Sequence, residues 1–581
     1  FICVVPEAVK DVEIQQHQSS DDDSIIDNDP LLSSRDANST EEISDDQDPT
    51  PTARKGSRKK TVPVKFQDYI LNFSEALSVQ VDNCPKTYSE AMQCGWQDAI
   101  NDELQSLQTN KTWELVDRPV GKKVIDSKWV FTEKEVNGHQ VKKARLVARG
   151  FQQGEVDDTY APVARMVTIR TLFTVALEKD LQVIYMDVKT AFLHADLHDE
   201  IYMKLPEGTP ETITGINNSK VCKLLRALYG LKQGPKCWYD RLHEKLIQME
   251  FVRSQVDPCL YFKDKTYILV TVDDILLFYE NVATANIIKQ NLSQDFHMKF
   301  IEMKDKIKFL GIEIIRTQNT IVFNQTAFAQ RILDTFHMSD CKVMSLPLEP
   351  KLQLPVSNEE KNDVNVPYRE LLGSLMYLML GTRPDLCYAV NFFSKFQNNV
   401  SLTHWKHLKN VLRYLKGTLD YSLTFEKGQS VPPLVSYVDA DFANDIMDRK
   451  SITGFIVKLY GNNVFWQSKK QTIVTLSSTE AEYVALSDSV RELKFLNQLI
   501  NEILDQDLIP IIYHDNQNSI IIAKNLETKR SKHVDVKFHF VREEILKRRL
   551  LVEYIPSNDQ VADIFTKNPF VSFHYSLIQW Y

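Results

Sequence analysis

Two adjacent aspartates, Asp273 and Asp274, lie between two short runs of apolar residues, 267–272 and 275–278. Apolar runs on either side of a turn predict a tight β-hairpin with both acids at its tip. Two carboxylates held together can bind Mg²⁺, which prefers oxygen ligands. The competing interpretation is an ordinary turn, because aspartate tolerates turn geometry and bonds its own backbone. The pair alone leaves both interpretations open.

Two further segments bear on that choice. Asp187 ends the apolar run 183–186, where it could also cap the residues that follow. A Gly-rich turn at 228–235 opens an amphipathic helix, with Pro235 suitably early in it. Phosphates bind at helix starts of this kind, although ordinary caps look the same.

A second set of acids follows later in the chain. Asp439 ends the predicted strand 434–439, and Asp515 ends the predicted strand 510–515. A long predicted helix between them begins at 477–480, where the spacing of Ser477 and Glu480 is that of a capping box. Glu480 therefore most simply serves the helix start.

Glu482 lies on a different face of that helix from Glu480. At 100° per residue it shares the face of four apolar residues, Leu486, Leu493, Leu496 and Ile500. An acid aligned with an apolar stripe needs a reason, and metal binding is one. Stabilisation of the helix dipole is the alternative.

The elements that position these acids belong to a chain of ordinary globular composition. Its 581 residues suffice for three or four compact units, and 43% hydrophobic with 25% charged residues is usual for soluble protein. No apolar run reaches membrane-spanning length, so no membrane partner is expected. The eight cysteines are scattered singly, which is typical of a reducing compartment without structural zinc.

The net charge of −9 is concentrated at the start of the chain. The first sixty residues hold fourteen acidic and seven basic residues, which accounts for −7 and leaves −2 for the remainder. Residues 1–75 have the composition of a disordered acidic linker. The basic run 54–60 within it could be a nuclear-import or nucleic-acid patch, but it is most simply solvated. The chain begins with Phe1, which suggests a piece of something longer.

In their order and spacing, these segments resemble the reverse transcriptases of Ty1/copia-type retrotransposons and the ribonuclease H that follows them. The resemblance spans nearly everything from about residue 90 to residue 567. The matching motifs are Ala144–Gly150, Tyr160–Arg165, Asp187–Leu193, Leu228–Gln233, Phe309–Glu313 and Gly381–Asp385.

The resemblance implies an α+β multidomain fold, a right-hand polymerase of fingers, palm and thumb followed by a ribonuclease H-like α/β domain. The implied divisions are fingers and palm at 76–335, thumb or connection helices at 336–430, ribonuclease H at 431–570 and a divergent tail at 571–581.

The resemblance also assigns the acids. Asp187 and Asp273, assisted by Asp274, would hold two Mg²⁺ ions for RNA-directed DNA synthesis. Two further Mg²⁺ ions, for cleavage of the RNA strand of an RNA–DNA hybrid, would be held by Asp439, Glu482, Asp515 and Asp563. Asp535 is the alternative to Asp563 as the fourth acid.

Four residues would bind the incoming dNTP by the same resemblance. Phe192 would exclude ribose 2′-hydroxyls, Gln233 would lie beside the nucleotide, and Lys143 and Arg145 are candidates for its triphosphate. A surface location is the alternative for Gln233, Lys143 and Arg145.

A basic helical face is predicted at 404–417. Lys406, Lys409, Arg413 and Lys416 oppose Leu408, Val411, Leu412 and Leu415 at helical spacing. This face could follow the template-primer backbone or be merely solvated.

One departure from the family pattern stands beside the first acids. The pattern at the hairpin is Tyr-x-Asp-Asp, and here Thr271 occupies the aromatic position.

The main hypothesis is an enzyme that copies retrotransposon RNA into DNA, with an RNA template, a DNA primer and other polyprotein products as partners. The alternative is a decayed or host-adopted copy that binds nucleic acid without polymerising. The expected location is a cytoplasmic virus-like particle, with the nucleus as a second possibility.

Overall fold

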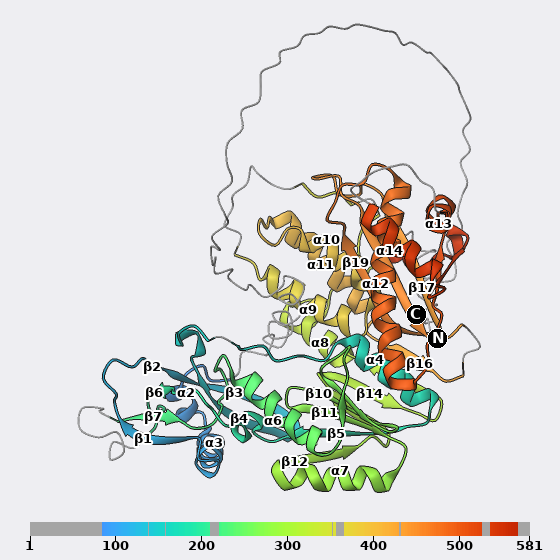
Figure 1. Cartoon of the computed structure of the whole chain (residues 1–581). Helices are drawn as coiled ribbons and strands as arrows, with labels where there is room; N and C mark the ends of the chain where they lie inside the picture. Colours follow the sequence, from blue (N-terminus) through green and yellow to red (C-terminus); the bar gives the residue numbers. More distant parts are fainter. Residues whose placement is uncertain are drawn as a thin grey trace, which may run out of the picture. The chain divides into compact units, whose positions relative to one another are not determined.

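The computed structural model describes residues 84–136, 139–156, 158–209, 220–350, 352–355, 365–428, 432–525 and 535–567 (Figure 1). The predicted linker at 1–75, its basic run and the predicted tail at 571–581 lie outside the described residues. Among the described residues the predicted α+β class is confirmed, because five sheets alternate with helices along the chain.

The first part of the described chain combines a hairpin with a small sheet. The hairpin consists of β3 (Ser127–Val136) and β4 (His139–Ala148). A four-stranded sheet has the order β1-β7-β6-β2. Its strands are β1 (Trp113–Asp117), β2 (Val124–Ile125), β6 (Tyr202–Met203) and β7 (Lys220–Leu224). The helices α2 (Tyr88–Gln93) and α3 (Gln97–Thr109) precede it, and Trp96, Ile100 and Leu146 are in its core.

A six-stranded sheet of order β12-β5-β11-β10-β9-β8 carries the first group of acids. Its strands are β5 (Gln182–Val188), β8 (Val252–Arg253), β9 (Leu260–Lys263), β10 (Thr266–Thr271), β11 (Asp274–Tyr279) and β12 (Met298–Glu302). Three helices pack with it, α4 (Met166–Glu178), α6 (Gly234–Gln248) and α7 (Val282–Asp295).

Both faces of this sheet are buried, which explains why its central strands read as continuous apolar runs. In β11, Ile275 and Leu277 join the core that contains Trp238 of α6 and Ile288 of α7. The alternate residues Leu276 and Phe278 join the core that contains Phe173 of α4. The predicted hairpin is confirmed, since β10 and β11 are antiparallel neighbours.

The middle of the chain is mainly helical. Its helices are α8 (Thr326–Thr335), α9 (Tyr368–Gly381), α10 (Cys387–Ser394) and α11 (Leu402–Gly417), which share one core. A sheet of order β13-β14-β15-β16 brackets them in sequence. Its strands are β13 (Lys306–Phe309), β14 (Ile312–Arg316), β15 (Thr320–Asn324) and β16 (Leu423–Glu426).

The predicted amphipathic character of 404–417 is confirmed. Leu408, Val411, Leu412 and Leu415 are buried in α11, while Lys406 and Arg413 are exposed. The other two cations of the predicted face have protein partners, because Lys409 lies over the Trp405 ring and Lys416 donates to the Cys341 carbonyl.

The last sheet has the order β19-β18-β17-β20-β21 and carries the second group of acids. Its strands are β17 (Leu434–Asp441), β18 (Ile452–Leu459), β19 (Asn462–Lys470), β20 (Ile511–His514) and β21 (Leu551–Tyr554). Strands β17 to β19 are antiparallel, whereas β20 and β21 run parallel to β17. The helices α12 (Ser478–Leu504), α13 (Gln517–Lys524) and α14 (Asp535–Leu546) accompany it.

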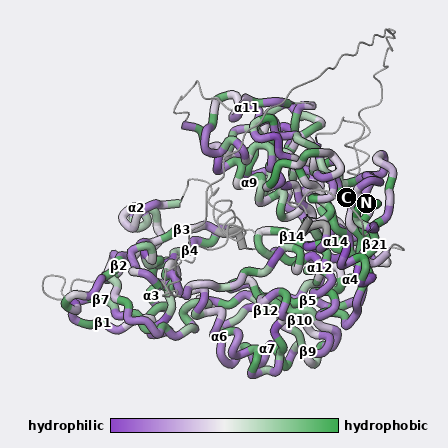
Figure 2. Tube along the Cα trace, turned by 45° about the horizontal axis from the view of Figure 1, so that its top comes forward, coloured by the Kyte–Doolittle hydropathy of each residue, from purple (hydrophilic) through white to green (hydrophobic). Residues whose placement is uncertain are grey.

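The N-terminal capping of α12 follows the predicted pattern with one difference. Ser477 accepts from the backbone N–H of Glu480, as a capping box requires. The Glu480 carboxylate, however, accepts from the N–H of Leu476, one residue before the cap. Among the described helices, none is long and apolar enough to cross a membrane. Figure 2 shows that hydrophobic and hydrophilic residues are mixed along the described trace.

Two candidate carboxylate sites

The first candidate site lies where the β10–β11 hairpin meets β5. Asp274 is the first residue of β11 and is paired in register with Asp187 of β5. Asp273 occupies the turn, and its carbonyl accepts from the N–H of Val188. The three acids predicted from the sequence thus come from two adjacent strands and are all partly exposed.

The turn itself is held in an unusual conformation. Val272 has a φ of 57°, in the left-handed region that a β-branched residue rarely adopts. The indole N–H of Trp238 donates to the Val272 carbonyl at 2.6 Å. This bond from α6 fixes the turn, and with it the adjacent Asp273.

Tyr185 supports the pair from beneath. It lies two residues before Asp187 on the same strand, and its hydroxyl donates to the Asp274 carboxylate. Burial, followed by the negative charge of Asp274, raises the pKa of the Tyr185 phenol well above its usual value. Tyr185 is therefore a hydrogen-bond donor to Asp274 throughout the neutral pH range.

Two of the predicted nucleotide-binding residues meet on a tyrosine that the sequence did not single out. The rings of Phe192 and Tyr229 are edge to face with centroids 4.6 Å apart. The Arg145 guanidinium lies 4.8 Å from the centre of the same Tyr229 ring. Burial raises the pKa of Tyr229, and the charges of Asp273 and Asp187 contribute in the same direction. Tyr229, which contacts both Phe192 and Arg145, therefore lies close enough to Asp273 and Asp187 to be affected by their charges.

Gln233 and Lys143 differ from that pair. The Gln233 amide is buried, donates to Asp199 at 2.8 Å and accepts from Gln153 at 2.9 Å. Lys143 is exposed on β4. Gln233 thus holds neighbouring loops together in this structure, so a role beside a nucleotide would require exchanging one of these bonds.

Thr271 is buried at the end of β10, with 5% of its surface exposed, and pairs across the hairpin with Asp274. Its hydroxyl oxygen is buried without a hydrogen-bond partner. A buried, unsatisfied hydroxyl costs free energy, so threonine is not stabilised here by a bond of its own.

The second candidate site gathers acids from four elements. Asp439 is on β17, Glu482 on α12, Asp515 directly after β20, and Asp563 on the short 3₁₀ helix Val561–Phe565. The parallel pairing of Val438 with His514 places Asp439 and Asp515 at the same edge of the sheet. The β17–β20 neighbours could not be deduced from the sequence order alone.

Mutual repulsion in this site is visible in the pKa values. Burial and then the charges of Asp439 and Asp515 raise the pKa of Glu482 well above its usual value. Burial and then Asp439 raise the pKa of Asp563 to about 7. One oxygen of each, Oε2 of Glu482 and Oδ1 of Asp563, is buried without a hydrogen-bond partner.

Lys567 and Thr566 complete the surroundings of these acids, and sequence reasoning gave neither a role. The Lys567 ammonium lies 2.9 Å from Asp563 and 3.9 Å from Asp439. The Thr566 hydroxyl donates to Asp439. Lys567 thereby supplies one positive charge among four carboxylates.

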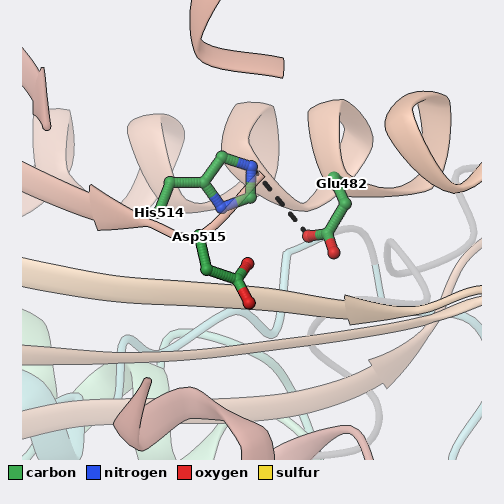
Figure 3. Close-up of side chains that lie close together, drawn as sticks. All are labelled: Glu482, His514 and Asp515. Atoms are coloured by element: carbon green, nitrogen blue, oxygen red, sulfur yellow. Dashed lines mark ion pairs between the residues drawn. The ribbon is translucent and has the colours of Figure 1, made fainter. Parts of the chain in front are cut away.

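Figure 3 shows the tightest group in the second site. The Glu482 carboxylate points from α12 toward the imidazole of His514, and Asp515 follows next in the chain. One ligand atom from each of these three residues lies within 4.8 Å of the others. Among the described residues this is the one such group of three, so Asp187, Asp273 and Asp274 are more widely spread. The side chain of Asp535, the alternative fourth acid, lies outside the described residues.

The chain is similar to known proteins over most of its length. The family model for reverse transcriptase (RNA-dependent DNA polymerase) matches residues 110–350, which include the first site. The retrovirus-related Pol polyprotein from transposon TNT 1-94 of Nicotiana tabacum is 39% identical over 488 residues, covering 81% of this chain and 36% of that protein. The Pol polyprotein from transposon RE1 of Arabidopsis thaliana is 34% identical over 534 residues, covering 90% and 36%.

The class is thus reverse transcriptase. More narrowly, the chain belongs to the Pol polyproteins of Ty1/copia-type retrotransposons, as its motifs predict. It spans about a third of the length of the curated relatives it matches. Among solved structures, a foamy viral protease-reverse transcriptase in complex with RNA/DNA hybrid covers 79% of this chain and 53% of its own, with 12% identity and a TM-score of 0.44.

Proposed function

We propose that this chain copies retrotransposon RNA into DNA and cleaves the RNA strand of the resulting hybrid. The observation that carries the proposal is the register of β5, β10 and β11, which sets Asp187 beside the Asp273–Asp274 turn. Family membership supports the same conclusion. The RNA template, DNA primer, dNTPs, other polyprotein products and a location in cytoplasmic particles belong to the proposal.

Divalent cations fit both groups of acids. In the second site, the unpartnered oxygens of Glu482 and Asp563 and their raised pKa values are what buried, crowded carboxylates show when no metal ion is bound. Asp187, Asp273 and Asp274 would hold Mg²⁺ in the first site, and Asp439, Glu482, Asp515 and Asp563 in the second. When bound, Mg²⁺ lowers the pKa of the attacking hydroxyl or water and neutralises the leaving oxygen.

The side chains around the first site would orient the nucleotide. Phe192 is held edge-on against Tyr229, and its ring would exclude a ribose 2′-hydroxyl. Arg145 is fixed by the same ring and would offer its guanidinium to the phosphates. Lys143, exposed on the same strand, would add a second positive charge.

Primer extension and hybrid cleavage with Mg²⁺ test the two sites separately. Asp273→Asn should lower extension on the order of 10²–10³-fold and leave hybrid cleavage within about twofold, because one preorganised charge is lost from one site. Asp439→Asn should give the reverse pattern. Loss of both activities in either variant, with the fold intact, would contradict two independent sites.

Thr271 favours a second candidate function, a copy that binds template-primer without extending it. If this chain binds template-primer but does not extend it, and Thr271→Tyr extends, the decayed copy is the correct description. If the unchanged chain extends, the enzyme proposal stands and threonine is compatible with catalysis. If neither chain extends or cleaves although both bind nucleic acid, a non-enzymatic binding protein is supported.

A further inference from the structure

His514 is the feature of the second site that the proposed function does not use. Its side chain is fully buried, and its Nε2 atom has no hydrogen-bond partner. Nε2 lies 3.9 Å from Oε2 of Glu482, which is also buried and unpartnered. Two unsatisfied polar atoms therefore face one another across a gap too long for a hydrogen bond.

The other ring nitrogen decides what Nε2 can do. Nδ1 of His514 lies 3.1 Å from the carbonyl oxygen of Val438, which can only accept a hydrogen bond. Nδ1 must therefore carry the ring proton, and Nε2 of the neutral imidazole presents a lone pair.

A lone pair on nitrogen thus faces a carboxylate oxygen, and a metal cation between them would bind both. A third oxygen is close, because a carboxylate atom of Asp515 lies within 4.8 Å of the other two ligand atoms. Asp515 is itself oriented by Ser557, whose hydroxyl donates to its Oδ2 atom at 2.8 Å. Such hydrogen bonds from outside a metal site orient the ligands.

The distances suit a transition metal. Zn–N and Zn–O bonds of roughly 2.0–2.2 Å put two ligands of a tetrahedral ion roughly 3.4 Å apart. The observed 3.9 Å between Nε2 and Oε2 would close to this value by about half an ångström of movement in the Glu482 side chain. One imidazole and two carboxylates is a donor set that favours Zn²⁺ over Mg²⁺, which takes oxygen ligands.

We propose that Glu482, His514 and Asp515 form a binding site for a Zn²⁺-like transition-metal ion. Because Glu482 and Asp515 are also the proposed Mg²⁺ ligands, such an ion excludes Mg²⁺ from them and inhibits hybrid cleavage. This inhibition rests on the proposed function, whereas the binding itself does not.

Co²⁺ is the probe for binding, because its visible absorption reports the number and kind of ligands. The full chain is titrated with Co²⁺ alongside His514→Asn, which keeps a donor near the Nδ1 position for Val438 and lacks Nε2. His407→Asn is the matched control, since His407 also faces a glutamate, Glu349, at 3.5 Å but belongs to no group of three metal-ligating residues among the described residues. We expect His514→Asn to weaken the tightest Co²⁺ site at least about tenfold and His407→Asn to leave it unchanged.

A second variant and a second measurement keep the test decisive. Glu482→Gln should weaken Co²⁺ in the same way, and X-ray absorption of the unchanged chain with one equivalent of Zn²⁺ should show imidazole scattering. Equal Co²⁺ affinity in folded His514→Asn, or Zn²⁺ with oxygen ligands alone, overturns the site.

The inhibition is measured separately. Zn²⁺ is added to Mg²⁺-supported hybrid cleavage, and each chain is compared with its own rate without Zn²⁺. Half-inhibition of His514→Asn should require about tenfold more Zn²⁺ than the unchanged chain. If no chain cleaves hybrid, the proposed function fails while the Co²⁺ result still decides the site; equal inhibition of both chains overturns the regulatory consequence.

Discussion

Tyr185 contacts the first site through one atom, the hydroxyl that donates to Asp274. Tyr185→Phe keeps the ring among its neighbours and removes only that donor. A hydrogen bond of this kind usually changes metal affinity or activity by about 10–100-fold. We therefore expect primer extension by Tyr185→Phe to need about tenfold more Mg²⁺, measured as the concentration giving half-maximal rate.

Tyr239→Phe is the control for this measurement. Its hydroxyl donates to the Pro258 carbonyl and to no acid of the site. An unchanged Mg²⁺ requirement in Tyr185→Phe, or an equal change in both variants, would show that the contact with Asp274 does not support metal binding.

Asp563 predicts how the stability of the metal-free chain depends on pH. Its pKa is raised to about 7 in the folded chain, from 3.8. The folded state therefore binds more protons than the unfolded state between about pH 4 and pH 7, so stability falls as pH rises through this window. Asp563→Asn should flatten this decline and raise the Tm at pH 8, measured by thermal unfolding in EDTA.

Asp559→Asn provides the comparison, because Asp559 lies nearby on an exposed 3₁₀ turn. A decline that persists unchanged in Asp563→Asn would assign it to other groups.

At this scale the sequence predicted which acids lie on neighbouring elements, but few of the residues that contact them. Tyr185 was within reach of prediction, since it lies two residues before Asp187 and strand residues two apart share a face. His514, Thr566 and Lys567 were not, because their contacts depend on which strands become neighbours. The hydrophobic periodicity of the sequence does not determine which strands become neighbours.

At the scale of elements, the motif Gly381–Asp385 joins the ends of two helices. Arg383 follows α9 and pairs with Asp385 at 2.7 Å, while it donates to the carbonyl and hydroxyl of Thr418 after α11. The Tyr414 hydroxyl of α11 donates to Asp385 as well. All four side chains are buried, so this network fixes the two helix ends relative to one another.

Arg383→Met should destabilise the chain by about 3–5 kcal/mol, because it leaves the Asp385 carboxylate buried without its cation. The double variant Arg383→Met, Asp385→Leu should recover part of this loss in urea unfolding. A double variant that is less stable than the single one would mean that the network contributes through its hydrogen bonds rather than through charge balance.

Elements of strong local pattern were predictable, and those made by distant pairing were not. The β10–β11 hairpin, α11 and α12 follow from apolar spacing, caps and turn residues. Strand β16 pairs with β15 although the helices α8 to α11 lie between them in the sequence. The four residues of β16 do not indicate which strand will be their partner. Whether two strands so far apart in the sequence pair depends on the packing of the elements between them. The local sequence of either strand does not indicate this packing.

At the scale of the molecule, one continuous core includes residues of both sheets that carry acids. It contains Phe173 of α4 and Phe278 of β11 together with Phe455 of β18 and Leu496 of α12. Arg170 of α4 crosses this junction, donating to the carbonyls of Leu380, Gly381 and Val464 and lying 3.8 Å from the centre of the Trp466 ring. The domain boundary predicted at residue 430 therefore divides the sequence, whereas the hydrophobic core continues across it.

Arg170→Met tests this junction. The loss of a buried cation that serves several carbonyls should lower the free energy of unfolding by about 2–4 kcal/mol. Arg170→Lys should recover little, because an ammonium cannot reach carbonyls on both sides as the guanidinium fork does. Arg331→Met, which removes a guanidinium that lies over the Phe328 ring on α8, is the control. A smaller loss in Arg170→Met than in this control would place the strength of the junction elsewhere.

The shared core also bears on how copies of such an element decay in a genome. A frameshift after residue 430 would remove β19, on which α4 packs, and with it Val464 and Trp466, which contact Arg170. The truncated product would then be prone to aggregation, so a lesion in the second half of the chain would also disable the first half.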